Sequence, residues 1–236
     1  MPDTRPNILF LFADQHRFDF LGTNQALPVR TPNIDRQVGR LVDTLAERGE
    51  LENTVIVYSS DHGEMLGDHN RWRKQTYYHP SLGVPLAVAG PGIVEGVLNE
   101  TPVALHDLAA TFLEYAAAGT LRDQEAVSLR PLLAGETQRV RDYAFAGLKN
   151  WRLVFDGRYK LIVTQRPSAQ QDGKSLAQLL QPGGGVIEDS GVQLFDLAAD
   201  PLENVNFAAQ APGEVERLRR ALEAHLASGE RARELY

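Results

Sequence analysis

One stretch of the sequence decides the fold: residues 54–64, which read TVIVYSSDHGE. Its first five residues are all β-branched or aromatic, and a short apolar run of this kind predicts a buried strand. The run ends in a polar cluster, Asp61-His62-Gly63-Glu64. Because an open parallel sheet presents its ligand crevice at the carboxyl ends of its strands, we expect these polar groups to line such a crevice.

A second segment, near the start of the chain, also has an apolar run followed by polar residues. Residues 7–13, NILFLFA, form an apolar run that leads directly into Asp14-Gln15-His16-Arg17. Between the two strands, apolar residues recur at helical spacing at Ile34, Val38, Leu41, Val42 and Leu45, and Gly49 follows as a stop signal. Strands that alternate with amphipathic helices predict a doubly wound α/β core with a mostly parallel sheet.

The remainder of the chain divides into two regions with different patterns of predicted elements. Residues 84–89 predict another strand and residues 105–118 a helix, which complete a core over residues 1–140. From about Arg141 the predicted strands are short, at residues 143–145, 151–155, 159–163 and 192–197, with Asp156-Gly157 as a hairpin signal. Residues 166–190, rich in Gln, Gly and Ser, predict an excursion between strands. The last part, residues 141–236, therefore predicts a small antiparallel subdomain closed by a helix with Val215, Leu218, Leu222 and Leu226 on one face.

Composition excludes several classes of protein. The chain has 236 residues, a net charge of -7 and no cysteine. The acidic balance argues against nucleic-acid binding, and the lack of cysteine excludes disulfides, thiolate metal sites and a cysteine-derived nucleophile. The apolar run at residues 8–12 is too short for a signal-peptide core or a membrane span, so we expect a cytoplasmic protein without membrane contact. The oligomeric state is left open.

Two polar pairs are candidate metal ligands. Asp14 with Gln15, and Asp61 with His62, each follow a predicted buried strand, so they converge if those strands are neighbours. Carboxylate and amide oxygens suit calcium or magnesium, and an imidazole also admits manganese. The alternative is that Asp14 and Asp61 are loop carboxylates that cap the following helices.

Three longer motifs carry a family resemblance. Residues 5–15 (RPNILFLFADQ), 31–35 (TPNID) and 53–69 (NTVIVYSSDHGEMLGDH) resemble the sulfatase family of the alkaline-phosphatase superfamily, and residues 103–111, 159–161 and 194–201 continue the match. The resemblance implies a sulfuric ester hydrolase with a sulfatase-like α/β fold. It also implies that Asp14, Gln15, Asp61 and His62 bind a divalent metal, with calcium expected and manganese or magnesium as alternatives.

The same resemblance assigns a role to Lys74 and narrows the substrate class. Lys74 matches the cation that holds the sulfate or phosphate oxygens of the substrate; by itself it would be interpreted as a solvated surface lysine. Gln15 and His62, where many arylsulfatases have Asp and Asn, resemble the branch of choline-sulfatases and phosphonate monoester hydrolases. We therefore expect a small-molecule sulfate, phosphate or phosphonate ester as the partner of this site.

One family motif is missing. Sulfatases carry a Cys or Ser in a (C/S)-x-P-x-R motif that is oxidised to formylglycine, whereas the nearest counterpart here, Ala26-Leu27-Pro28-Val29-Arg30, has alanine at that position. Residues 34–41 serve both as the end of the TPNID segment and as the start of the next helix, which indicates a fold shortened in its middle. Covalent catalysis is then absent. The chain is either an impaired family hydrolase or a non-catalytic remnant that binds a metal or an oxyanion.

Overall fold

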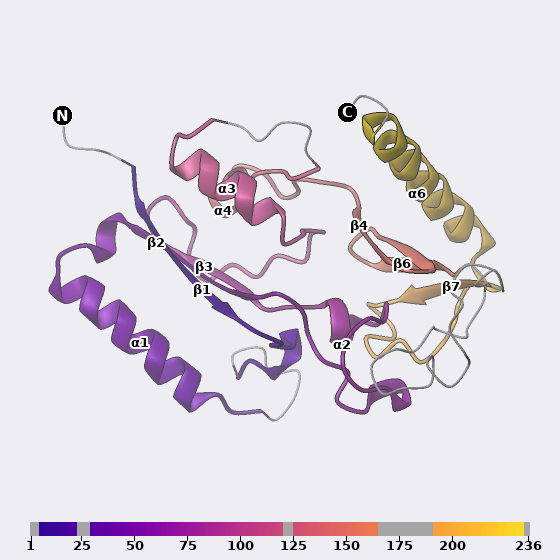
Figure 1. The fold of residues 1–236 in the computed structure, drawn as a ribbon, viewed down its shortest axis with the longest axis horizontal. Coiled ribbons are helices and arrows are strands. Elements are labelled where there is room, and N and C mark those ends of the chain that lie inside the picture. Colours follow the sequence, from indigo (N-terminus) through magenta and orange to yellow (C-terminus); the bar gives the residue numbers. More distant parts are fainter. Residues whose placement is uncertain (1–4, 23–28, 120–124, 165–190, 234–236) are drawn as a thin grey trace. The chain divides into compact units, whose positions relative to one another are not determined.

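The computed structural model describes residues 5–22, 29–119, 125–164 and 191–233, and the chain divides into two compact units (Figure 1). The first unit comprises Met1–Glu64, Leu82–Asn99 and Val103–Val140, and the second comprises Met65–Ser81, Glu100–Pro102 and Arg141–Tyr236. The predicted excursion at residues 166–190 lies outside the described residues, as does Ala26 with its neighbours 23–28. Within the described ranges, no helix combines the length and apolar character that a membrane crossing requires.

The elements follow one another along the chain in a simple order. In the first half they are β1 (Asn7–Ala13), η1 (Phe18–Phe20), α1 (Pro32–Glu47), η2 (Leu51–Asn53), β2 (Thr54–Ser60), η3 (Asp68–Asn70), α2 (His79–Leu82) and β3 (Leu86–Ala89). In the second half they are α3 (Asp107–Tyr115), α4 (Arg130–Leu133), β4 (Ala144–Leu148), β5 (Trp151–Phe155), β6 (Tyr159–Thr164), β7 (Gly191–Asp196) and α6 (Pro212–Arg233).

The sheet of the first unit has the order β1-β2-β3, with β2 in the centre. β1 and β2 are parallel neighbours, which meets the condition for the two predicted ligand pairs to converge, whereas β3 runs antiparallel to β2. β3 begins at Leu86, two residues later than predicted, directly after Pro85, which has no backbone N–H to donate to a ladder. β2 is almost fully buried because it has a paired neighbour on each side, and Val55 and Val57 are 1% exposed.

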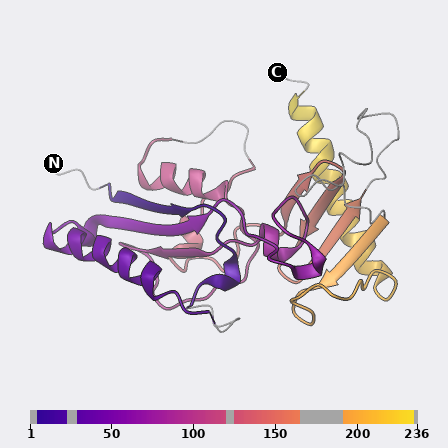
Figure 2. The ribbon, with the colours of Figure 1, turned by 60° about the horizontal axis from the view of Figure 1, so that its bottom comes forward.

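Helices lie on both sides of this sheet, with α1 on one side and α3 and α4 on the other (Figures 1 and 2). α1 starts at Pro32, where the fixed φ of proline suits the first helical turn, and it is unbroken across residues 34–41. α3 ends at Tyr115, three residues before the predicted end, and it packs on β2 through Leu108 and Tyr115. The core of this unit therefore lies between β2 and α3.

β1 and α1 bury less than their sequences predict. No residue of β1 is buried, and Phe12 is 52% exposed, because the described sheet pairs β1 with β2 alone and leaves its other edge without a neighbour. α1 also has no buried residue, and Leu41 on its apolar face is 43% exposed. The expectation that the first strand is buried is therefore wrong among the described residues, although the strand itself forms where predicted.

The second unit is an antiparallel sheet of order β4-β5-β6-β7, with α6 packed on one face. The Asp156-Gly157 hairpin joins β5 to β6 as predicted, and Asp156 Oδ1 accepts backbone N–H groups from Arg158 at 2.8 Å and Tyr159 at 2.7 Å. On α6, Leu218 and Leu222 are buried against the sheet, whereas Leu226 is 39% exposed. The apolar stripe of the final helix is thus largely confirmed.

The segment Met65–Ser81, which carries Lys74, folds with the second unit through a buried ion pair. Lys160 on β6 forms this pair with Glu203, and the two side chains are 5% and 0% exposed. Lys160 Nζ also donates to Tyr77 O at 2.8 Å, while Glu203 Oε2 accepts the backbone N–H of His79 at 2.6 Å. Burial lowers the pKa of Lys160, and Glu203 opposes this shift. The charge pair therefore anchors one end of the segment to the sheet.

Five non-glycine residues of this segment have positive φ, and they are Leu66, His69, Asn70, Arg73 and Gln75. Such conformations are costly for side chains with a Cβ atom and persist where the surrounding structure holds them. The anchoring by Lys160 and Glu203 supplies part of that support.

We predict that Lys160→Met strongly destabilises the second unit, because it leaves the carboxylate of Glu203 buried without its cation. Removing one partner of a buried ion pair costs about 3–5 kcal/mol. The double variant Lys160→Met/Glu203→Gln should recover much of this loss, since a glutamine still accepts the His79 N–H. Urea unfolding of the parent, single and double variants checks the prediction, and an equal loss in both variants would contradict it.

Candidate metal centre

The register of β1 and β2 brings the two predicted ligand pairs together. Ala13 lies opposite Ser60 at the carboxyl ends of the two parallel strands, so Asp14 and Asp61 both leave the sheet at the same edge. Asp14, Asp61 and His62 each offer one donor atom, and the three atoms lie within 4.8 Å of one another. Two carboxylate oxygens and one imidazole nitrogen form a donor set that suits a divalent cation such as calcium or manganese.

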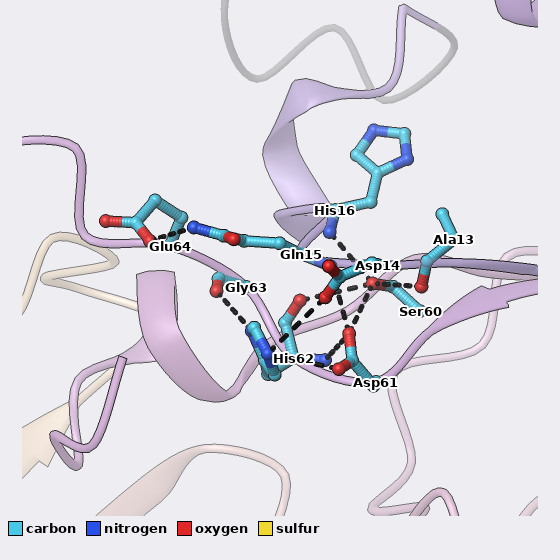
Figure 3. A network of polar contacts seen from close by, with 9 residues as sticks. All are labelled: Ala13, Asp14, Gln15, His16, Ser60, Asp61, His62, Gly63 and Glu64. Carbon is cyan, nitrogen blue, oxygen red and sulfur yellow. Dashed lines mark hydrogen bonds and ion pairs between the residues drawn. The ribbon is translucent and has the colours of Figure 1, made fainter. Parts of the chain in front are cut away.

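Backbone groups hold Asp61 in place. Its Oδ1 accepts the N–H groups of Gln15 and His62, both at 2.9 Å, which leaves Oδ2 on the side of the His62 ring (Figure 3). Partial burial by itself raises the pKa of Asp61, but the backbone donors and the neighbouring imidazole outweigh it and lower the pKa below its ordinary value. Asp61 is therefore ionised at neutral pH, as a metal ligand must be.

His62 presents its second ring nitrogen to the two carboxylates. Its Nδ1 lies 2.9 Å from Gly63 O, and because a carbonyl oxygen can only accept, Nδ1 carries a proton. Nε2 then lies 3.1 Å from Asp61 Oδ2 and 3.8 Å from Asp14 Oδ1. This nitrogen therefore offers a lone pair beside two carboxylates, and a bound cation would relieve the repulsion between them.

Gln15 is close to the cluster but its side chain is directed elsewhere. Its Nε2 donates to Glu64 Oε2, so the carboxamide extends toward Glu64 and away from Asp61 and His62 (Figure 3). Its backbone is left-handed, with φ 61°, which places its N–H on Asp61. The structure thus brings together Asp14, Asp61 and His62 of the predicted ligands, while the role of Gln15 as a ligand stays a prediction.

Lys74, the predicted substrate-binding cation, belongs to the second unit and lies within Met65–Ser81. Its role as the substrate-binding cation stays a prediction.

Sequence reasoning places Glu64 in the polar cluster that follows β2, but it does not predict that Glu64 and Ser60 support the candidate ligands. Glu64, 6% exposed, receives the Gln15 amide, and the buried Ser60 hydroxyl contacts backbone atoms of both turns. Both residues lie within residues 54–64, but sequence spacing does not reveal which hydroxyl or carboxylate faces the neighbouring strand.

His16 is held outside the cluster, although it follows Gln15. Its Nε2 lies 3.2 Å from Phe20 O, and since this carbonyl can only accept, Nε2 carries a proton and the neutral ring's Nδ1 accepts from the Tyr58 hydroxyl at 2.6 Å. Burial raises the pKa of Tyr58, which keeps that hydroxyl protonated. The imidazole of His16 is therefore occupied by structural hydrogen bonds.

Comparison with known proteins gives consistent results. The sequence model of the Sulfatase family matches residues 31–118. The chain is 32% identical to the choline-sulfatase of Rhizobium meliloti (strain 1021) over 230 residues, which are 91% of this chain and 40% of that enzyme. The chain thus spans less than half the length of this relative.

Solved structures agree with the sequence comparison. A structure determined in complex with its substrate D-glucosamine-2-N,6-O-disulfate superposes with a TM-score of 0.66 at 25% identity, covering 83% of this chain and 38% of that one. The phosphonate monoester hydrolase of Silicibacter pomeroyi superposes with a TM-score of 0.63 at 26% identity, covering 81% and 38%. On matched sequence and shared fold, this chain belongs to the sulfatase family.

Proposed function

We propose that this chain carries the metal-binding part of a sulfatase-type site and binds a divalent cation through Asp14, Asp61 and His62, with Gln15 as a further ligand. The observation that carries the proposal is the convergence of the three donor atoms within 4.8 Å at the ends of two parallel strands. Gln15 can become a ligand in two ways. Its carboxamide can rotate away from Glu64, or its oxygen can face the cation while its nitrogen still donates to Glu64. Calcium is the expected ion, with manganese or magnesium as alternatives.

The substrate class follows from the family and from Lys74. The choline-sulfatase relative and the phosphonate monoester hydrolase neighbour support a small-molecule sulfate ester, or a phosphate or phosphonate ester, as the ligand. Lys74 is proposed to hold the oxygens of its oxyanion as a compact positive charge. A bound cation would supply Lewis-acid stabilisation of charge on the transferring group.

Hydrolysis by the family's covalent route is proposed to be absent or impaired in this chain. The sequence has no cysteine, and none of its prolines is preceded two positions earlier by the serine that a (C/S)-x-P-x-R motif requires. Without such a side chain no formylglycine nucleophile can form on this chain. The proposed activity is therefore binding of a metal and an oxyanion, with sulfate ester hydrolysis as the function of the family.

We predict that calcium or manganese raises the Tm of the parent chain and that Asp61→Asn abolishes the increase. The amide oxygen of the introduced asparagine still accepts the N–H groups of Gln15 and His62, so the turn is retained while the ligand charge is lost. An ion at 100 times its Kd stabilises the native state by about 2.7 kcal/mol. Asp43→Asn, at an exposed position on α1, is the control and should keep the full shift. A parent chain whose Tm is unaffected by either ion would remove the proposal.

We also predict that Lys74→Ala weakens binding of inorganic sulfate by about tenfold or more, since a hydrogen bond to a charged group is worth about 1.5–3 kcal/mol. Isothermal titration with the metal-loaded chain measures this, with Arg36→Ala on the exposed surface of α1 as the control. Phenylphosphonate as a second titrant separates a preference for phosphonate from one for sulfate.

In the same preparation, release of a chromogenic aryl sulfate should stay at the background rate with and without metal. Turnover comparable to that of an intact sulfatase would show that the chain does not need the missing motif.

A further inference from the structure

The hydroxyl of Ser60 lies at the junction of the two turns that carry the candidate ligands. Ser60 is the last residue of β2 and is 0% exposed. Its Oγ lies 2.8 Å from the backbone nitrogen of His16 and 3.0 Å from Ala13 O, at the two ends of the turn after β1. It also lies 3.1 Å from His62 O, on the turn after β2 (Figure 3).

The donor and acceptor roles follow from the capacity of a hydroxyl, which has one proton and two lone pairs. The His16 N–H can only donate, so Oγ accepts from it. The single proton of Oγ then goes to one carbonyl at a time, either Ala13 O or His62 O, with Asp61 Oδ1 more distant at 3.4 Å. The hydroxyl therefore contacts residues on both sides of the Asp14-Gln15 pair and also the backbone beyond Asp61.

These contacts matter because the turn between Ala13 and His16 is strained. Gln15 has φ 61°, a conformation that is unfavourable for a residue with a Cβ atom and persists only where surrounding contacts hold it. Two consecutive backbone N–H groups of this turn donate to side chains at the end of β2 and just after it. The N–H of Gln15 donates to Asp61 Oδ1, and the N–H of His16 donates to Ser60 Oγ. Asp14 itself has an 84% exposed side chain, so its backbone is what keeps it near His62.

We propose that Ser60 is a positioning residue of the metal centre: its hydroxyl sets the separation between Asp14 on one turn and Asp61 with His62 on the other. The inference rests on the proposed function, because it requires that these side chains bind a cation. The hydroxyl is not one of the proposed ligands, and it acts through the backbone of the two turns. Partners of this kind that orient metal ligands typically change metal affinity by about 10–100-fold when they are removed.

A neighbouring serine provides a matched control. Ser59 is also 0% exposed and lies on the same strand, but its Oγ donates to Pro85 O at 2.9 Å, on the side of β3. Ser59→Ala and Ser60→Ala therefore each remove one buried hydroxyl with its hydrogen bonds from β2. Both should lower the stability of the chain, and Ser60→Ala alone should change metal binding.

The experiment is a titration of the full chain with calcium, followed calorimetrically, for the parent, Ser60→Ala and Ser59→Ala. We expect Ser60→Ala to weaken calcium binding by about 10–100-fold and Ser59→Ala by less than about twofold. Ser60→Thr, which keeps the hydroxyl, should restore most of the affinity. Equal affinities in the parent and Ser60→Ala, or equal losses in both alanine variants, would overturn the role of Ser60.

A second readout needs no metal. Amide hydrogen exchange in the metal-free chain should show that the His16 N–H loses protection in Ser60→Ala and keeps it in Ser59→Ala. If Ser60→Ala does not fold, Ser60→Cys takes its place, since a thiol hydrogen-bonds weakly and is a poor ligand for calcium. If the parent chain binds neither calcium nor manganese, both the proposed function and the role of Ser60 are overturned. If the parent binds the ion and the Ser60 variant binds it equally well, only the role of Ser60 is overturned.

Discussion

The parallel pairing of β1 with β2 is the constraint on which the candidate metal centre depends. Because the two strands are in register up to Ala13 and Ser60, the residues that follow them leave the sheet side by side. A donor atom of Asp14 thereby comes within 4.8 Å of donor atoms from the distant Asp61-His62 pair. Two backbone N–H groups, from Gln15 and His16, and the buried Ser60 hydroxyl then connect the turns. A shift of one residue in this register would turn every side chain of β1 to the other face and separate Asp14 from Asp61.

β1 and α1 of the first unit are more exposed than their sequences predict. Both elements are rich in apolar residues, yet neither has a buried residue among the described contacts. The relatives matched here are more than twice as long, and the chain covers 38–40% of them. Among the described strands, one edge of the apolar β1 has no partner, and the helix next to it runs unbroken through residues 34–41. This is the pattern expected if the central part of such a sheet is absent.

The two units arrange their charged side chains differently. At the candidate metal centre, the carboxylates of Asp14 and Asp61 converge near the surface, where a cation would neutralise them. In the antiparallel subdomain, opposite charges on Lys160 and Glu203 neutralise each other inside the core and hydrogen-bond to the backbone of Met65–Ser81. The first arrangement is suited to binding, and the second is suited to fixing a segment whose backbone is strained.

The sequence by itself determined the strands, the helices α1, α3 and α6, the hairpin and the family, because apolar periodicity and turn residues are local and the motifs are long. It also identified Asp14, Asp61 and His62 as chemically related, since each follows an apolar strand. Only the tertiary structure decided that β1 lies at an edge of the described sheet, that β3 is antiparallel, that Gln15 turns to Glu64, and that Ser60 joins the two turns. These features depend on which strands become neighbours and on which buried polar group finds a partner, and both are set by contacts between residues far apart in the chain.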